Sequence, residues 1–110
     1  ERITQAVSLK RNGDFDKANS IYTVLDSKFP NDPIILKSWA KILVCLGEYD
    51  NAVEKYKNAS VLYKSIGNPE YYQCDDQIQK IVNRFENPEK FTSWVYAVSG
   101  GSIQRENVVI

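Results

Sequence analysis

Residues 13–18 read Gly-Asp-Phe-Asp-Lys-Ala and residues 47–52 read Gly-Glu-Tyr-Asp-Asn-Ala, so one short pattern occurs twice with an offset of 34 residues. In each copy a glycine precedes an acidic residue and an aromatic residue, and an alanine follows three positions after the aromatic. A period of this length is typical of helical repeats, in which each unit is a pair of helices joined by a tight turn. The pattern therefore predicts stacked helical hairpins.

Apolar residues spaced by three and four positions predict about six amphipathic helices. The alternation of apolar and polar residues that indicates a β-strand does not occur up to residue 101. An Asp or Asn before a proline is a typical helix start, because its side chain accepts a hydrogen bond from a free backbone N–H. Glycine and proline separate the predicted helices at Asn12-Gly13, Pro30–Pro33, Gly47, Gly67–Pro69, Asn87-Pro88 and Gly100-Gly101. The sequence thus predicts an all-α domain.

The bulk composition excludes several classes of protein. The chain has 110 residues, with 14 basic and 14 acidic side chains and a formal net charge of zero. That balance favours neither nucleic acid nor an anionic membrane as a partner, and no apolar run is long enough to span a bilayer. We expect a cytoplasmic protein. Because the chain opens inside a predicted helix and not at a methionine, we also expect it to be part of a longer protein.

The residues that usually carry catalysis are scarce. There is no histidine, which removes the commonest general base and metal ligand. Cys45 and Cys74 match no metal motif and are too few to form a disulfide scaffold, so we expect reduced, packed cysteines. Gly100-Gly101 lacks the lysine of a phosphate-binding loop. We therefore expect no enzyme activity, no metal and no cofactor.

The placement of small and large residues resembles the tetratricopeptide repeat (TPR) family. The matches are Ala6, Leu9, Gly13, Phe15, Ala18, Tyr22 and Pro30 in the first unit, and Ala40, Leu43, Gly47, Tyr49, Ala52, Tyr56 and Ala59 in the second. The resemblance implies a right-handed α-solenoid of antiparallel helical hairpins over residues 1–101, with repeats at about 1–32 and 33–67. Residues 68–101 would form a divergent third unit, because Pro88 stands where a small helical residue belongs. Residues 102–110 would be a C-terminal tail, either flexible or briefly extended.

The resemblance also implies a concave groove, lined by the first helix of each unit, that takes a peptide or a helix. Carrying the groove positions over gives Val7, Lys10, Arg11, Lys37, Lys41, Val44, Gln73 and Gln77 as partner-binding residues, with Ile34, Cys45 and Lys80 beside them. The basic residues among them would favour an acidic or carboxylate-bearing peptide through charge-assisted hydrogen bonds. The alternative is an ordinary solvated helix face, where lysines four residues apart are common.

These features lead us to expect a protein–protein interaction module, an adaptor or scaffold. The alternatives are a structural element that assembles with itself as a homo-oligomer, and a regulatory domain of a longer protein. The assembly alternative depends on Phe91 and Trp94, which would form an exposed apolar surface on the last helix unless the tail covers them. The other large aromatic residues, Tyr22, Trp39, Tyr49 and Tyr56, lie on the apolar stripes, where we expect them to pack in the core.

Overall fold

The computed structural model describes residues 2–110, with side chains from residue 4 onward. Its elements are α1 (Arg2–Arg11), α2 (Phe15–Lys28), α3 (Pro33–Cys45), α4 (Tyr49–Ser65), α5 (Tyr71–Val82), α6 (Pro88–Val98) and a short 3₁₀ helix, η1 (Arg105–Asn107). No strand occurs within residues 2–110, so the all-α class is confirmed. Residue 1, where the first predicted repeat begins, lies outside the described residues.

The two glycines of the repeated pattern close the turns after α1 and α3. Gly13 has φ +82° and Gly47 has φ +75°, a left-handed conformation that glycine adopts without steric cost. The residue after each glycine donates its backbone N–H to a carbonyl of the preceding helix: Asp14 to Leu9 at 2.8 Å, and Glu48 to Leu43 at 2.9 Å. These hydrogen bonds satisfy carbonyls at the helix ends, and they confirm both predicted turns.

The predicted helix starts are also present. The carboxylate of Asp32 accepts hydrogen bonds from two backbone N–H groups in the first turn of α3, and the Asn87 side chain accepts one in α6. Each is followed by a proline that begins the helix. Asn68 accepts a similar bond from the N–H two residues later, and α5 begins shortly afterwards at Tyr71.

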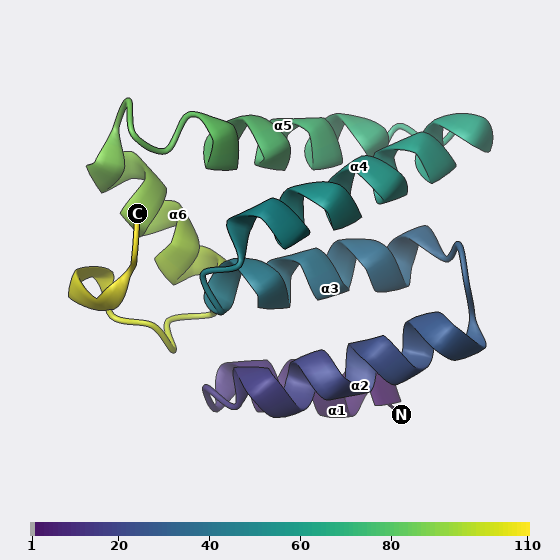
Figure 1. Ribbon diagram of the computed structural model, residues 1–110, viewed down its shortest axis with the longest axis horizontal. Coiled ribbons are helices and arrows are strands. Elements are labelled where there is room, and N and C mark those ends of the chain that lie inside the picture. The colour runs from purple at the N-terminus through teal and green to yellow at the C-terminus, as the bar shows by residue number, and fades with distance from the viewer. Residues whose placement is uncertain (1) are drawn as a thin grey trace.

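The first five helices pack in sequence order, each against its neighbours along the chain (Figure 1). A smaller apolar cluster joins α1, α2 and α3, and a larger one joins α3, α4, α5 and α6. Small residues allow the helices to approach closely. The alanines at these crossings are fully buried: Ala6, Ala18, Ala40, Ala52 and Ala59.

The aromatic residues on the stripes pack as expected. Tyr22, Tyr49 and Tyr56 are buried, while Trp39 is half-buried and touches both clusters. The indole Nε1 of Trp39 donates a hydrogen bond of 2.6 Å to Asn19 Oδ1 on α2. Large aromatic rings therefore fill the space between helices, and the half-buried indole of Trp39 has a polar partner.

Helix α6 departs from the predicted third hairpin. Its main helix contact is with α3, not with the adjacent α5, and it runs across the carboxyl ends of α3 and α5 (Figure 1). No residue in the connection 83–87 has a positive φ, unlike Gly13 and Gly47 in the first two hairpins. Without such a residue the chain does not form a tight reversal after α5, and α6 packs against α3 instead.

From the sequence we expect the C-terminal tail to be flexible or briefly extended. In the structure it contains the short helix η1 and packs against the rest of the domain. Ile103, Val108 and Ile110 are half-buried against the larger apolar cluster. Arg84 Nε donates a 2.8 Å hydrogen bond to the carbonyl of Ile110, and the Tyr49 hydroxyl donates to the carbonyl of Val109. The tail thus packs back on the start of α4 and the end of α5.

Candidate functional site

Three lysines from two helices form what we call the basic face: Lys10 on α1, and Lys37 and Lys41 on α3. All three are half-buried, so their aliphatic stems lie against the protein. The structure therefore brings together the predicted basic residues of the first and third helices. Arg11, the fourth predicted basic residue, is exposed at the end of α1.

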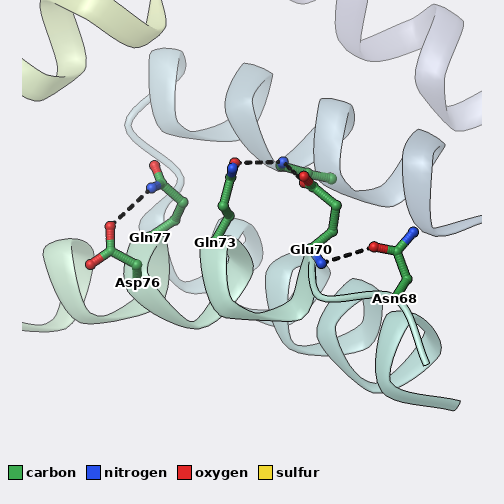
Figure 2. A network of polar contacts seen from close by, with 6 residues as sticks. Asn68, Glu70, Gln73, Asp76 and Gln77 are labelled. Atoms are coloured by element: carbon green, nitrogen blue, oxygen red, sulfur yellow. Dashed lines mark hydrogen bonds and ion pairs between the residues drawn. The ribbon is translucent and has the colours of Figure 1, made fainter. Parts of the chain in front are cut away.

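Lys37 is neutralised within the chain. Its Nζ lies 2.5 Å from Glu70 Oε2 and 3.1 Å from Gln73 Oε1, and its side chain is 15% exposed. Glu70 and Gln73 extend from the α5 segment toward α3 (Figure 2). Lys37 is thus a polar link between α3 and α5, which makes it a poorer anchor for a partner than the sequence suggested.

Lys41 lies one turn further along α3 and has no such partner. Within residues 4–110, no carboxylate approaches its ammonium within ion-pair distance. Burial lowers the pKa of Lys41, and the positive charges of Lys37 and Lys10 lower it further. The charge of Glu70 acts in the opposite direction but is a smaller cause. Lys41 is thus a partly desolvated cation near two like charges, so it would gain from a nearby anion.

Lys10 lies close to Lys41 and Cys45, since its positive charge lowers the pKa of both side chains. Burial raises the pKa of the Cys45 thiol to about 11, which keeps this group protonated near neutral pH. Cys45 and the fully buried Cys74 are both free thiols. Because the thiolate is the reactive form, neither cysteine has the environment of a nucleophile.

Two predicted groove residues are covered by α6. Val44 is only 1% exposed and belongs to the same cluster as Phe91 and Val95, so its predicted contact with a partner is wrong in this arrangement. Gln77 is half-buried, and its side-chain oxygen accepts a 2.8 Å hydrogen bond from Trp94 Nε1. Gln77 and Gln73 are one turn apart on α5 (Figure 2), but only Gln77 meets α6.

The predicted assembly surface is also wrong. Phe91 is 3% exposed and packs edge-on against Tyr49, with ring centroids 5.4 Å apart. Trp94 is half-buried. Because α6 turns inward over α3, its aromatic face is covered by the protein itself and offers no exposed patch.

Three other predicted partner-binding or neighbouring residues are at least partly accessible. Ile34 is 59% exposed, Gln73 is exposed and Val7 is half-buried. Sequence reasoning missed Glu70, which forms an ion pair with Lys37. Glu70 is the N-cap residue of α5, and its contact with Lys37 requires α5 to lie beside α3, which no residue near Lys37 in the sequence indicates.

A separate cleft of about 370 Å³ lies between the end of α5 and the start of α6. Its charged side chains are of both signs, and Lys80 already contacts Asp76 at 2.5 Å. Phe91 and Trp94 form its apolar wall. This mixture gives no preference for one class of ligand.

Two further properties bear on the class of protein. Among the residues whose side chains are described, no group of three or more His, Cys, Asp or Glu could hold a metal ion. Over the same part of the chain, the helices are too short or too polar to cross a membrane.

Comparison with known proteins found no family model, no curated protein and no solved structure that matches this chain. The resemblance to the TPR family therefore depends on the internal repeat alone, and the function must be argued from the site.

Proposed function

We propose that this chain is a non-catalytic, TPR-like interaction module whose basic face binds an acidic segment of a partner protein. The observation that carries the proposal is Lys41, a half-buried ammonium with two neighbouring lysines and no carboxylate partner among the described side chains.

The energetics support a binding role for Lys41. Like charges four residues apart on a helix destabilise it by about 0.2–0.5 kcal/mol, and Lys37 and Lys41 are such a pair. The ion pair of Lys37 with Glu70 offsets part of this repulsion, and Lys41 itself has no ion pair within residues 4–110. A carboxylate from a partner would instead form a charge-assisted hydrogen bond in a partly desolvated setting.

The neighbouring groups suit an extended peptide. Gln73 accepts from Lys37 through its oxygen, so its amide NH₂ is free to donate to a peptide carbonyl. Ile34 and Val7 provide apolar surface one turn before Lys37 on α3 and one turn before Lys10 on α1. The site therefore combines charge, a hydrogen-bond donor and apolar contact, a combination typical of peptide recognition.

The proposal can be tested with random peptides displayed on phage and selected on the whole domain. We expect the selected peptides to be rich in Asp and Glu. The affinity of one such peptide should fall about tenfold, or about 1.4 kcal/mol, in Lys41→Glu, and it should weaken with added salt.

The matched control is Lys57→Glu, since Lys57 is exposed on α4 and takes no part in the basic face. It should bind the peptide as the wild type does. Equal affinities for Lys41→Glu and Lys57→Glu would exclude the basic face as the binding site.

The self-assembly alternative loses its basis, because Phe91 is buried within the chain. No other observation favours it over peptide binding.

A further inference from the structure

Two lysines of the basic face lie on one helix but have different surroundings. Lys37 and Lys41 are both half-buried on α3, and their spacing of four residues places them on the same side of the helix. The ammonium of Lys37 is held by Glu70 and Gln73, at 2.5 Å and 3.1 Å (Figure 2). Among the side chains of residues 4–110, no carboxylate forms an ion pair with Lys41. The nitrogen of Lys41 is therefore the one that no carboxylate engages.

The surroundings of Lys41 also favour its neutral amine. Burial is the largest cause that lowers its pKa, and the positive charges of Lys37 and Lys10 lower it further. Glu70 and Cys74 act in the opposite direction and are smaller causes. A lysine that is desolvated and close to another cation is activated as a nucleophile, because a larger fraction of it is uncharged at neutral pH.

We propose that Lys41 is a modification site, acylated by a small anionic donor of the acyl phosphate class. The neutral amine attacks the carbonyl carbon of the donor, so that a new N–C bond forms and the C–O bond to the phosphate breaks. The phosphate leaves with the electron pair of that bond and takes up the proton that the nitrogen loses. The product is an uncharged amide at Lys41.

The charges around Lys41 favour a donor that carries negative charge. Glu70 offsets the charge of Lys37 only in part, and Lys10 adds a second positive charge beside Lys41. Lys10 is kept in place at the end of α1, where the hydroxyl of Ser102 lies 3.0 Å from its carbonyl oxygen. Neighbouring cations raise the local concentration of an anion, so an acyl phosphate should meet this amine more often than it meets an isolated lysine.

Acylation would switch off the basic face. It removes the charge of Lys41 and blocks the nitrogen that would donate to a carboxylate. The affinity for an acidic peptide should therefore fall severalfold in the acylated chain. This consequence rests on the proposed function, whereas the reactivity of Lys41 does not.

The experiment treats the whole chain with a limited amount of acetyl phosphate and follows the acetylation of each lysine by mass spectrometry of its peptides. Lys41 should react severalfold faster than Lys57, which is exposed on α4 and has the acidic Glu54 one turn before it. Added salt should reduce this ratio, because it screens the attraction of the donor to the basic face. Salt should have a smaller effect on the reaction with acetic anhydride, an uncharged donor.

The variant Lys37→Gln gives a second measurement. It removes a like charge and leaves Glu70 without its partner, so Lys41 should react severalfold more slowly. The matched control Lys57→Gln should leave the rate at Lys41 unchanged. Reaction of Lys41 at or below the rate of Lys57 in the wild type would overturn the proposal, as would an unchanged rate at Lys41 in a folded Lys37→Gln chain.

Peptide binding distinguishes this inference from the proposed function. Fast acetylation of Lys41, with an unchanged affinity of the acetylated chain for an acidic peptide, would support the modification site and exclude the peptide-binding role. Slow acetylation, with an affinity that still falls in Lys41→Glu, would overturn the modification site alone.

Discussion

Tyr22 and Tyr56 lie 34 residues apart at equivalent places in the repeated pattern, and their buried hydroxyls have different surroundings: burial raises the pKa of Tyr22 while its polar neighbour Ser38 lowers it. Tyr56 is the residue at that offset, and its buried hydroxyl has no hydrogen-bond partner among the described residues. Ser38 lies six residues after the cap Asp32, and Cys74 lies six residues after the cap Asn68. A thiol is a weak hydrogen-bonding group, so the second pair leaves a polar atom unsatisfied.

This difference predicts opposite effects of the same mutation. Tyr56→Phe removes an unsatisfied hydroxyl and should raise the free energy of unfolding by about 1 kcal/mol, whereas Tyr22→Phe removes a hydroxyl that has Ser38 as a polar neighbour and should lower it by about 1 kcal/mol. Urea denaturation followed by circular dichroism would measure both. Changes of the same sign would mean that the two hydroxyls have similar environments.

The two lysines of α3 should also respond differently to neutralisation. Lys41→Gln relieves repulsion from Lys37 and should stabilise the domain by about 0.2–0.5 kcal/mol at low salt. Lys37→Gln breaks the contact with Glu70 and should destabilise it by about 0.5–1 kcal/mol. Thermal unfolding at low and high ionic strength would test this contrast, since salt should reduce both effects.

Stability should fall at alkaline pH partly because of Cys45. Burial raises the pKa of this thiol from 9.0 to about 11 on folding. The folded state therefore holds the proton more tightly, so this stabilising contribution is complete below pH 9 and is lost as the pH rises toward 11. The loss between these limits should be about 1–2 kcal/mol smaller in Cys45→Ala than in the wild type. An identical pH dependence of the two unfolding curves would count against a buried thiol.

Arg84 should control how firmly the tail is held. Its guanidinium lies 4.9 Å from the Tyr49 ring, and its Nε donates to the carbonyl of Ile110. Arg84→Ala should therefore accelerate tryptic cleavage after Arg105 severalfold, because local opening exposes the cleavage site. Arg11→Ala, which changes an exposed arginine on α1, serves as the control. Unchanged cleavage in Arg84→Ala would mean that the apolar residues alone hold the tail.

Features that depend on a few neighbouring residues could be predicted from the sequence. The turn at Gly13 and the cap at Asp32 each follow from one residue type and its conformational preference. The burial of Ala40 and Tyr22 follows from the helical spacing of apolar residues. All of these are local or periodic signals, and the structure contains them as predicted.

Features that depend on distant contacts could not be predicted. Val44 follows Lys37 and Lys41 at helical spacing, and nothing near it in sequence indicates that α6 will cover it. The pairing of Lys37 with Glu70 needs α3 and α5 to lie side by side. The burial of Phe91 could not be predicted for the same reason, because the direction of α6 depends on its contacts with α3.

The hydroxyl of Ser102 lies 2.7 Å from the carbonyl oxygen of Ser99 and 3.0 Å from that of Lys10, which is 92 positions away, so its single hydrogen is shared between the two acceptors. Nearly all other helix contacts connect neighbours along the chain, which favours rapid folding from local pieces. We expect this closure to form last, after the helices have found their neighbours. Because it ties the end of α1 to the segment after α6, it couples the two ends of the array, so that loosening of either end is transmitted to the other.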